Sequence, residues 1–306
     1  MKHIFNKTYS KMFTYVVVGI VVAISVFSGF FLASDYLARI QSNPTFEYFT
    51  QRLVILYSLM TFVLVSGLSI WMIVANTSSG LFANELHEGT LRLLLAKPVS
   101  RRDLVIGKIG GMLAGGMTYL VLSLMIVLSV FSLKAHPDQD ILIHLLKYTG
   151  VYILYGTFMI LIAGSIGTFL STCFKKKVPA LLILALIGFL IFGIIPIVRL
   201  MMQTSGIYNR MHLYLFDLNY HLALIFDTFT NLLGQMTGTS SQLELYNMFT
   251  NLFHYVPLDM DVALKTGTVM VANNTLNGVL VTAIYGVMGV LLYGLSFKRM
   301  EIKDIS

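Results

Sequence analysis

Apolar residues gather in six long runs along this chain, and shorter polar stretches separate the runs. A helix needs about 20 residues to cross a hydrocarbon layer of about 30 Å, and each run has roughly that length. We therefore predict an all-α, polytopic membrane protein with six transmembrane helices, built as a single domain over residues 1–306. The predicted spans are about 12–33, 53–75, 109–132, 149–172, 178–200 and 276–296.

A short basic segment, residues 1–11, precedes the first run and predicts an N-terminal amphipathic helix. Together with the run it resembles a signal peptide, but the run exceeds an apolar signal region of about 7–15 residues and no small-residue cleavage site closes it. We predict that the first run is a retained span.

Composition agrees with a membrane protein, because the mean hydropathy is +0.80 and only 11% of the residues are charged. The chain has one cysteine, Cys173. A single cysteine excludes an intramolecular disulfide and a zinc site with several cysteine ligands.

The net charge of +7 is distributed unevenly between the two sides. An even number of spans puts both termini on one side, and with that side inside, 14 basic and 5 acidic residues face inward against 7 basic and 9 acidic residues outside. This is the positive-inside bias of multispanning proteins. We predict cytoplasmic termini, contact with membrane lipid and no nucleic-acid partner.

A polar stretch between the second and third spans has the pattern of a helix start and stop. Asn84 is a candidate N-cap, Glu85 lies in the first turn, and Pro98 ends the helix. Ser100 and Asp103 then form a candidate capping box for the next helix. Such a short amphipathic helix could lie on the membrane surface.

The same stretch resembles a signature of type-2 ATP-binding-cassette (ABC) permeases, E-x-x-x-G-T-L-x-x-L-L-x-x-P-[VI]-S-R-x-x-L-x-x-G-K. The matching residues are Glu85, Gly89, Thr90, Leu91, Leu94, Leu95, Pro98, Val99, Ser100, Arg101, Leu104, Gly107 and Lys108. In that family the segment, here 84–101, is the cytoplasmic coupling helix that docks on the ATPase subunit. The resemblance implies coupling roles for Glu85, Glu88, Gly89, Thr90, Leu94, Pro98, Ser100 and Arg101.

What the resemblance implies is the permease subunit of an ATP-driven exporter in a bacterial plasma membrane. It would pair with a second permease copy, identical or related, and with separate ABC ATPase subunits. An interior without charges suits a hydrophobic or amphipathic substrate, such as a membrane-active or antimicrobial peptide. The long outside segment, residues 201–275, departs from compact members of the family and leaves the substrate open.

The chain itself lacks a nucleotide-binding motif. The phosphate-binding loop requires G-x-x-x-x-G-K-[ST], but position 102 is Arg102 and Lys108 is followed by Ile109. We therefore expect a non-catalytic subunit with no catalytic, cofactor-binding or metal-binding residues, and ATP and Mg²⁺ in the partner ATPase.

The alternative function is that of an ion-coupled secondary transporter or a non-transporting scaffold. No Asp, Glu or Lys lies near the middle of a predicted span, and Arg199 is expected to snorkel at the outer end of span five. Ion-coupled carriers usually keep ionisable residues at mid-membrane, so the pattern favours energy supplied from outside the membrane.

Small residues recur along the third predicted span, at Gly107, Gly111 and Gly115 beside Gly110 and Gly116. Such spacing lets helices approach closely. It serves dimers and single subunits alike, and we expect packing within one subunit here.

Two polar groups outside have candidate metal ligands: His136, Asp138, Asp140 and His144, and the i,i+4 pair Asp217 and His221. Neither supplies a full ligand set, so we expect solvated loops without metal. Aromatic-rich stretches in 201–275 predict interfacial helices at the outer leaflet, suited to an exit lid.

Overall fold

The computed structural model describes residues 2–40, 46–89, 100–204, 206–234, 240–255, 270–273 and 275–302. Six helices in this part of the chain are long and apolar enough to cross a membrane, which confirms the predicted number. They cover Thr14–Ile40, Gln51–His87, Arg101–Ala135, Gln139–Cys173, Lys177–Gln203 and Gly278–Glu301. Each observed span is longer than its apolar run because polar turns extend it at one end or both.

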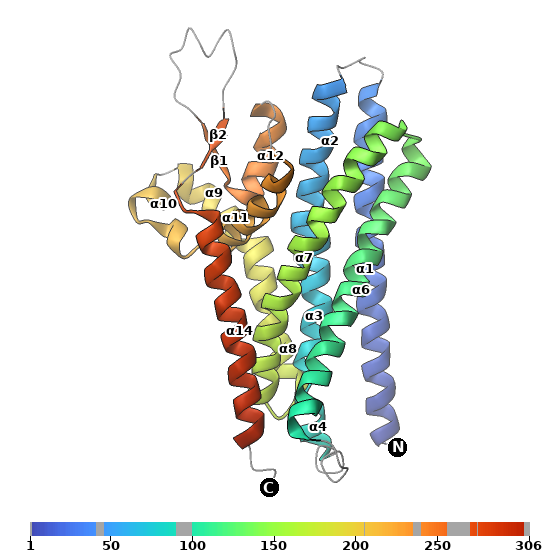
Figure 1. Cartoon of the computed structure of the whole chain (residues 1–306), viewed down its shortest axis with the longest axis vertical. Coiled ribbons are helices and arrows are strands. Elements are labelled where there is room, and N and C mark those ends of the chain that lie inside the picture. Colours follow the sequence, from blue (N-terminus) through green and yellow to red (C-terminus); the bar gives the residue numbers. More distant parts are fainter. Residues whose placement is uncertain are drawn as a thin grey trace.

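The first four spans form a bundle of long helices (Figure 1). The helix α1 (Lys2–Ile40) includes the predicted leader, so residues 2–11 continue the first span instead of forming a separate helix. The second span consists of α2 (Phe46–Met60), the π-helical segment η1 (Thr61–Ser69) and α3 (Ile70–Ser79), and a turn leads into the short α4 (Ala83–Glu88). The third and fourth spans are α6 (Arg101–Ala135) and α7 (Gln139–Cys173).

The fifth span starts with α8 (Lys177–Phe189), passes through a second π-helical segment, η2 (Leu190–Ile194), and ends in α9 (Ile195–Thr204). Short elements follow: α10 (Ile207–Arg210), η3 (Leu213–Leu215), α11 (Leu218–Thr230), η4 (Asn231–Leu233) and α12 (Ser240–Thr250). The strands β1 (Phe253–Tyr255) and β2 (Met270–Ala272) pair antiparallel, with Phe253 opposite Ala272. The last span is α14 (Gly278–Ile302).

Burial places the second span at the centre of the bundle. In its most apolar stretch 83% of the residues are buried, against 11% in α14, which lies at the periphery. Polar side chains in the core bond across helices, as Tyr57 does with Thr149 at 2.8 Å and Ser58 with Tyr152 at 2.6 Å. Such bonds satisfy hydroxyls that neither lipid nor water reaches.

The two π-helical segments face each other. A Cβ atom on Gly67 of η1 would lie 2.8 Å from a ring carbon of Phe192 in η2. Three hydroxyls of η1, those of Thr61, Ser66 and Ser69, are buried without a hydrogen-bond partner among the described residues. Insertions of π-helix are common sites of helix kinks, so spans two and five each have such a site at this level of the bundle.

The helix α11, which carries much of the aromatic-rich stretch of segment 201–275, is not the interfacial helix that this stretch predicted. Leu222, Ala223, Leu224, Ile225 and Phe226 of α11 are at most 5% exposed. The ring of Phe226 lies between Tyr152 and Tyr155 of α7, at centroid distances of 5.4 and 4.8 Å. The apolar residues of α11 therefore extend the core, and the polar elements around α11 form a small subdomain at the end of the bundle remote from α4 (Figure 1).

The glycine pattern of α6 has two different structural meanings. Gly116 packs within the subunit, since a Cβ there would lie 3.0 Å from Ile160. Gly107, Gly110, Gly111 and Gly115 would each have open space around a Cβ. The expectation of close packing within one subunit is therefore right for Gly116 and wrong for these four.

Replacing Gly167 with alanine is expected to destabilise the protein by about 1–3 kcal/mol, because the new methyl group would overlap the Ser78 side chain, whose Cβ lies 2.7 Å away. Gly111→Ala is the matched control: its methyl group meets open space, and alanine favours a helix by up to about 1 kcal/mol. Thermal unfolding in detergent compares the two. Equal melting temperatures would contradict this packing of α3 on α7.

Candidate functional site

The described parts of the signature, residues 85–89 and 100–108, lie at one end of the bundle, where α4, the start of α6 and the end of α14 meet (Figure 1). Phe82, Val105 and Met300 are buried there, in a cluster separate from the main core. Leu86, Leu104 and Phe297 pack around this cluster. The cluster brings together three helices that are far apart in the sequence, and we call it the junction.

The start of α4 is held by another helix. Its N-cap residue is Phe82, which has no side-chain cap, and Ser171 of α7 accepts hydrogen bonds from the backbone N–H groups of Phe82 and Ala83 at 2.8 and 3.1 Å. The first N–H groups of a helix lack partners within it, so Ser171 supplies what a local cap would supply. The prediction of Asn84 as the N-cap is wrong, because the N-cap is Phe82, two residues earlier, and Asn84 lies inside α4.

Glu85 points toward α6. Its Oε1 atom forms an ion pair with Nζ of Lys108, and the two side chains are 22% and 20% exposed. Lys108 also donates a hydrogen bond to the carbonyl of Leu81 at 2.9 Å and lies 5.3 Å from the ring centroid of Phe82. A partly buried pair with these further contacts holds α4 against α6 more firmly than an exposed pair would.

The predicted helix from Asn84 to Lys97 is interrupted at Gly89. The helix α4 ends at Glu88, and Gly89 has a φ of +68°, the left-handed conformation that commonly follows a helix end. Three predicted site residues, Thr90, Leu94 and Pro98, lie outside the described residues. Segment 84–101 thus contains the end of a short helix, and Gly89 sets that end.

The start of α6 matches its predicted cap. The Ser100 hydroxyl oxygen accepts from the backbone N–H of Asp103 at 3.1 Å and donates to the Asp103 carboxylate at 2.6 Å. The guanidinium of the neighbouring Arg101 donates to the backbone carbonyl of Glu301 at 3.0 Å. Arg101 and Arg102 are exposed, so this end presents basic side chains beside the junction.

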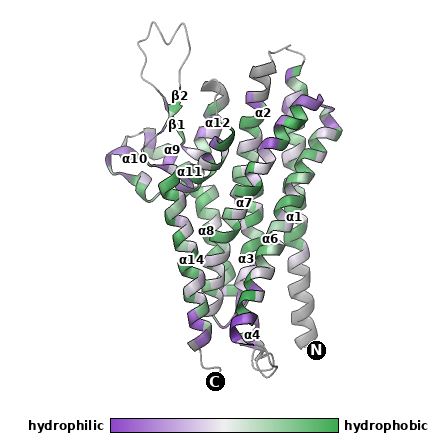
Figure 2. Ribbon diagram, in the orientation of Figure 1, coloured by the Kyte–Doolittle hydropathy of each residue, from purple (hydrophilic) through white to green (hydrophobic). Residues whose placement is uncertain are grey.

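Polar and apolar residues separate along the bundle as a membrane protein requires. In Figure 2 the middle of the bundle is mostly hydrophobic, and the hydrophilic residues concentrate near its two ends. The junction and the subdomain around α11 occupy these opposite ends.

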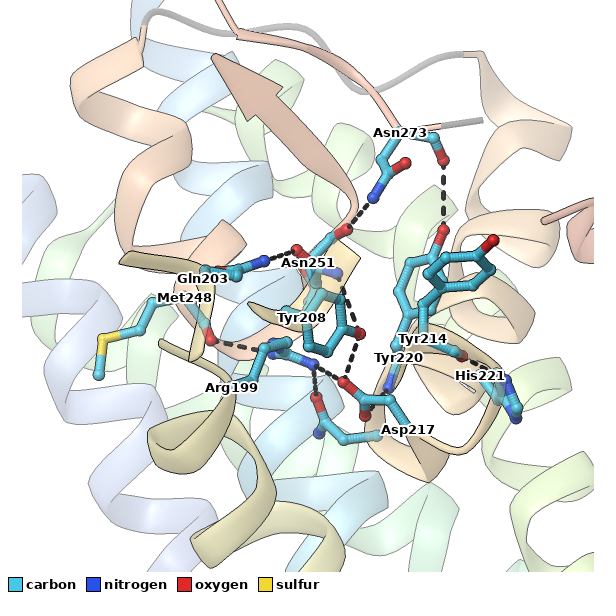
Figure 3. Close-up of polar contacts among 12 residues, drawn as sticks. Arg199, Gln203, Tyr208, Tyr214, Asp217, Tyr220, His221, Met248, Asn251 and Asn273 are labelled. Carbon is cyan, nitrogen blue, oxygen red and sulfur yellow. Dashed lines mark hydrogen bonds and ion pairs between the residues drawn. The ribbon is translucent and has the colours of Figure 1, made fainter. Parts of the chain in front are cut away.

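A buried ion pair organises the subdomain. Arg199 donates to the Asp217 carboxylate at 2.9 Å, and the two side chains are 2% and 3% exposed. Arg199 also donates to Asn219 and to the carbonyl of Met248, each at 3.0 Å (Figure 3). The prediction that Arg199 snorkels toward water is wrong, because Asp217 and these acceptors satisfy it inside the protein.

The Asp217 carboxylate has two further partners. It accepts from Tyr208 at 2.8 Å and caps α11 by accepting from the backbone N–H of Tyr220 at 2.8 Å. Burial, followed by the negative charge of Asp217, raises the pKa of Tyr208 well above its ordinary value, so its hydroxyl stays protonated and donates. The buried negative charge of Asp217 is therefore stabilised by one cation and by hydrogen bonds from a hydroxyl and a backbone N–H group.

Both ring nitrogens of His221 have hydrogen-bond partners, and neither partner is Asp217. Its Nε2 atom lies 3.0 Å from the carbonyl of Tyr214 and must donate, so Nδ1 accepts from the hydroxyl of Tyr285 at 3.0 Å. Burial lowers the pKa of His221, which favours this neutral tautomer. Within the described ranges, no three His, Cys, Asp or Glu residues are grouped to hold a metal ion.

A bundle of six long apolar helices, with a helical junction at the end of spans two and three, defines a polytopic membrane protein. The chain matches the family described as ABC-2 family transporter protein over residues 8–302, nearly its whole length, and it belongs to that family. Proteins of this family are the membrane subunits of ABC transporters and typically work with an ABC ATPase subunit. No curated protein matches the chain significantly.

Proposed function

We propose that this protein is the permease subunit of an ATP-driven exporter, powered by a separate ATPase and moving a hydrophobic or amphipathic substrate, such as a membrane-active peptide, out of the cell. The observation that carries the proposal is the junction, where Glu85 and Lys108 tie α4 to α6 beside a shared apolar cluster. A force applied to α4 would reach the third span directly through these contacts.

The charge distribution supports a cytoplasmic position for the junction. Lys175, Lys176, Arg101, Arg102 and Arg299 lie at the junction end of the described spans, and cytoplasmic loops carry the excess of lysine and arginine. Both termini would then be cytoplasmic. The ATPase, which binds ATP and Mg²⁺, would dock beside α4, and a second permease copy would complete the pathway.

The mechanism we propose is a two-state movement. Closure of the ATPases on ATP pushes α4 and the residues after it. The rigid contacts of Glu85 and Phe82 transmit this displacement to α6, and Arg101 transmits it to the end of α14. The π-helical segments η1 and η2 lie further along spans two and five and supply a place to bend as the pathway changes its accessible side.

Transport into inside-out vesicles tests the proposal. Vesicles from cells that make the permease and its ATPase should accumulate a fluorescent cationic amphipathic peptide when ATP is added, and accumulation should persist after a protonophore collapses the proton gradient. Vesicles from cells lacking the permease provide the control. Uptake that needs the gradient and not ATP would establish an ion-coupled transporter, and no uptake under either condition would leave a scaffold.

A further inference from the structure

The subdomain remote from the junction contains a large open pocket of about 1200 Å³. Its walls come from α9, α10, η3 with the preceding His212, α12, the segment around β1 and the residues after β2. Clefts for small molecules usually have about 300–1,000 Å³. The pocket therefore has room for an extended ligand.

Hydrogen bonds within the subdomain fix several of the side chains that line the pocket. Gln203 donates to the side chain of Asn251 at 2.5 Å, and Asn273 donates to the backbone carbonyl of Asn251 at 3.3 Å (Figure 3). Asn251 itself contacts Tyr208, which bonds to Asp217 of the buried ion pair. The network around Arg199 thus fixes the polar wall of the pocket. A ligand would therefore lose little free energy to the ordering of these side chains when it binds.

The chemistry of the wall is that of amides. The pocket is lined by five amide side chains, those of Gln203, Asn209, Asn247, Asn251 and Asn273. Hydrogen bonds within the protein already use both groups of Asn251 and Asn273. The Oε1 atom of Gln203, the Nδ2 atom of Asn247 and both groups of Asn209 have no partner among the described residues and remain as acceptors and donors for a ligand. A peptide backbone presents the same two groups at every residue. An extended peptide segment is therefore a matching ligand for these amides.

The apolar and charged residues of the lining further limit the class of ligand that fits the pocket. Leu200, Leu245, Met248 and Phe253 line the pocket and suit apolar side chains. Glu244 is the one acidic residue among the described lining residues, which also include His212 and His254, and the nearby Arg199 is already paired with Asp217. The carboxylate of Glu244 thus attracts a cation.

We propose that this pocket binds an extended segment of a cationic, amphipathic peptide. Glu244 pairs with a lysine or arginine of the peptide, the amides bond to its backbone, and the apolar residues receive its apolar side chains. The inference rests on the proposed function, because it assigns the substrate class to a site on the exit side of the exporter. A neutral oligosaccharide would use the amides but leave Glu244 and the four apolar residues without matching groups.

Peptide binding to the purified full-length permease in detergent tests this site without ATP or ATPase. The probe is a fluorescein-labelled octapeptide of alternating lysine and leucine, and fluorescence anisotropy gives its Kd. Glu244→Gln should weaken binding about threefold, as expected for an exposed ion pair. Leu245→Trp, which fills the pocket, should weaken it roughly tenfold or more, since ligand sites need their concave volume.

Matched controls separate the pocket from the rest of the surface. Glu301→Gln lies at the opposite end, and Leu232→Trp lies on η4 outside the pocket lining. Both should keep the wild-type Kd. A peptide with glutamate in place of lysine should bind weakly.

Three outcomes would overturn the proposal: equal binding of the glutamate peptide, equal effects of Leu232→Trp and Leu245→Trp, or competition by maltoheptaose together with no effect of Glu244→Gln. The last result would assign the site to a neutral glycan. Failure of the exporter proposal is distinguishable, because vesicle uptake would then be absent while peptide binding to the pocket persists.

Discussion

Replacing Arg199 with leucine is expected to lower the free energy of unfolding by about 3–5 kcal/mol, the cost of leaving one member of a buried ion pair alone. The Asp217 side chain, which is 3% exposed, would lose its cationic partner. The carbonyl of Met248 would lose its hydrogen-bond donor. Thermal unfolding in detergent measures the loss. Proteolysis of the variant should cut first within α10–α12, because the ion pair holds these elements to α9.

Arg39→Leu is the control for this prediction. Arg39 lies 3.9 Å from Asp35 and is 45% exposed, and Asp35 keeps its bond to Arg52. We expect a loss of at most about 1 kcal/mol. The double variant Arg199→Leu with Asp217→Leu should be less destabilised than Arg199→Leu alone. If Arg199→Leu and Arg39→Leu cost the same, the ion pair does not stabilise the subdomain.

Replacing Glu85 with glutamine should separate ATPase binding from transport. The variant loses the charge that pairs with Lys108, so α4 would move without carrying α6. We expect the ATPase to remain bound and the transport per ATP hydrolysed to fall at least about fivefold, the lower end of usual site-to-site coupling. Vesicle uptake and ATP hydrolysis measured on the same preparation give this ratio.

Lys108→Met should have at least the same effect, because it also removes the hydrogen bond to Leu81 and the contact with Phe82. The Glu85/Lys108 double variant should be no worse than Lys108→Met alone, because that change has already broken the ion pair. Glu301→Gln serves as the control, since Arg101 contacts the backbone carbonyl of Glu301. Additive losses in the double variant would show that the two residues act separately, and the role assigned to the pair would be wrong.

The spans and the cap of α6 could be predicted from sequence because both depend on neighbouring residues. Hydrophobic runs decide membrane insertion locally, and Ser100 reaches Asp103 within one turn. The start of α4 could not be predicted in this way. Its cap, Ser171, lies 89 residues from Phe82 in the chain, and only the packing of α4 on α7 brings them together.

The errors in segment 201–275 have a related cause. An apolar aromatic stretch with few charges fits an interfacial helix and a core helix equally well, and α11 is in the core because α7 supplies Tyr152 and Tyr155. Arg199 looked solvated because no acid is adjacent to it in sequence. A clue existed in Asp217, a plausible helix N-cap close to an arginine at the membrane boundary.

We propose that this permease works with a separate ATPase docked beside α4. Co-purification tests this association most directly. Tagged protein would be purified in mild detergent from its native host and its partners identified and quantified by mass spectrometry. We predict an ABC ATPase in stoichiometric amount, retained in Glu85→Gln and lost in Arg101→Glu. Purification of the folded permease without any ATPase, under conditions that preserve other membrane complexes, would contradict the claim.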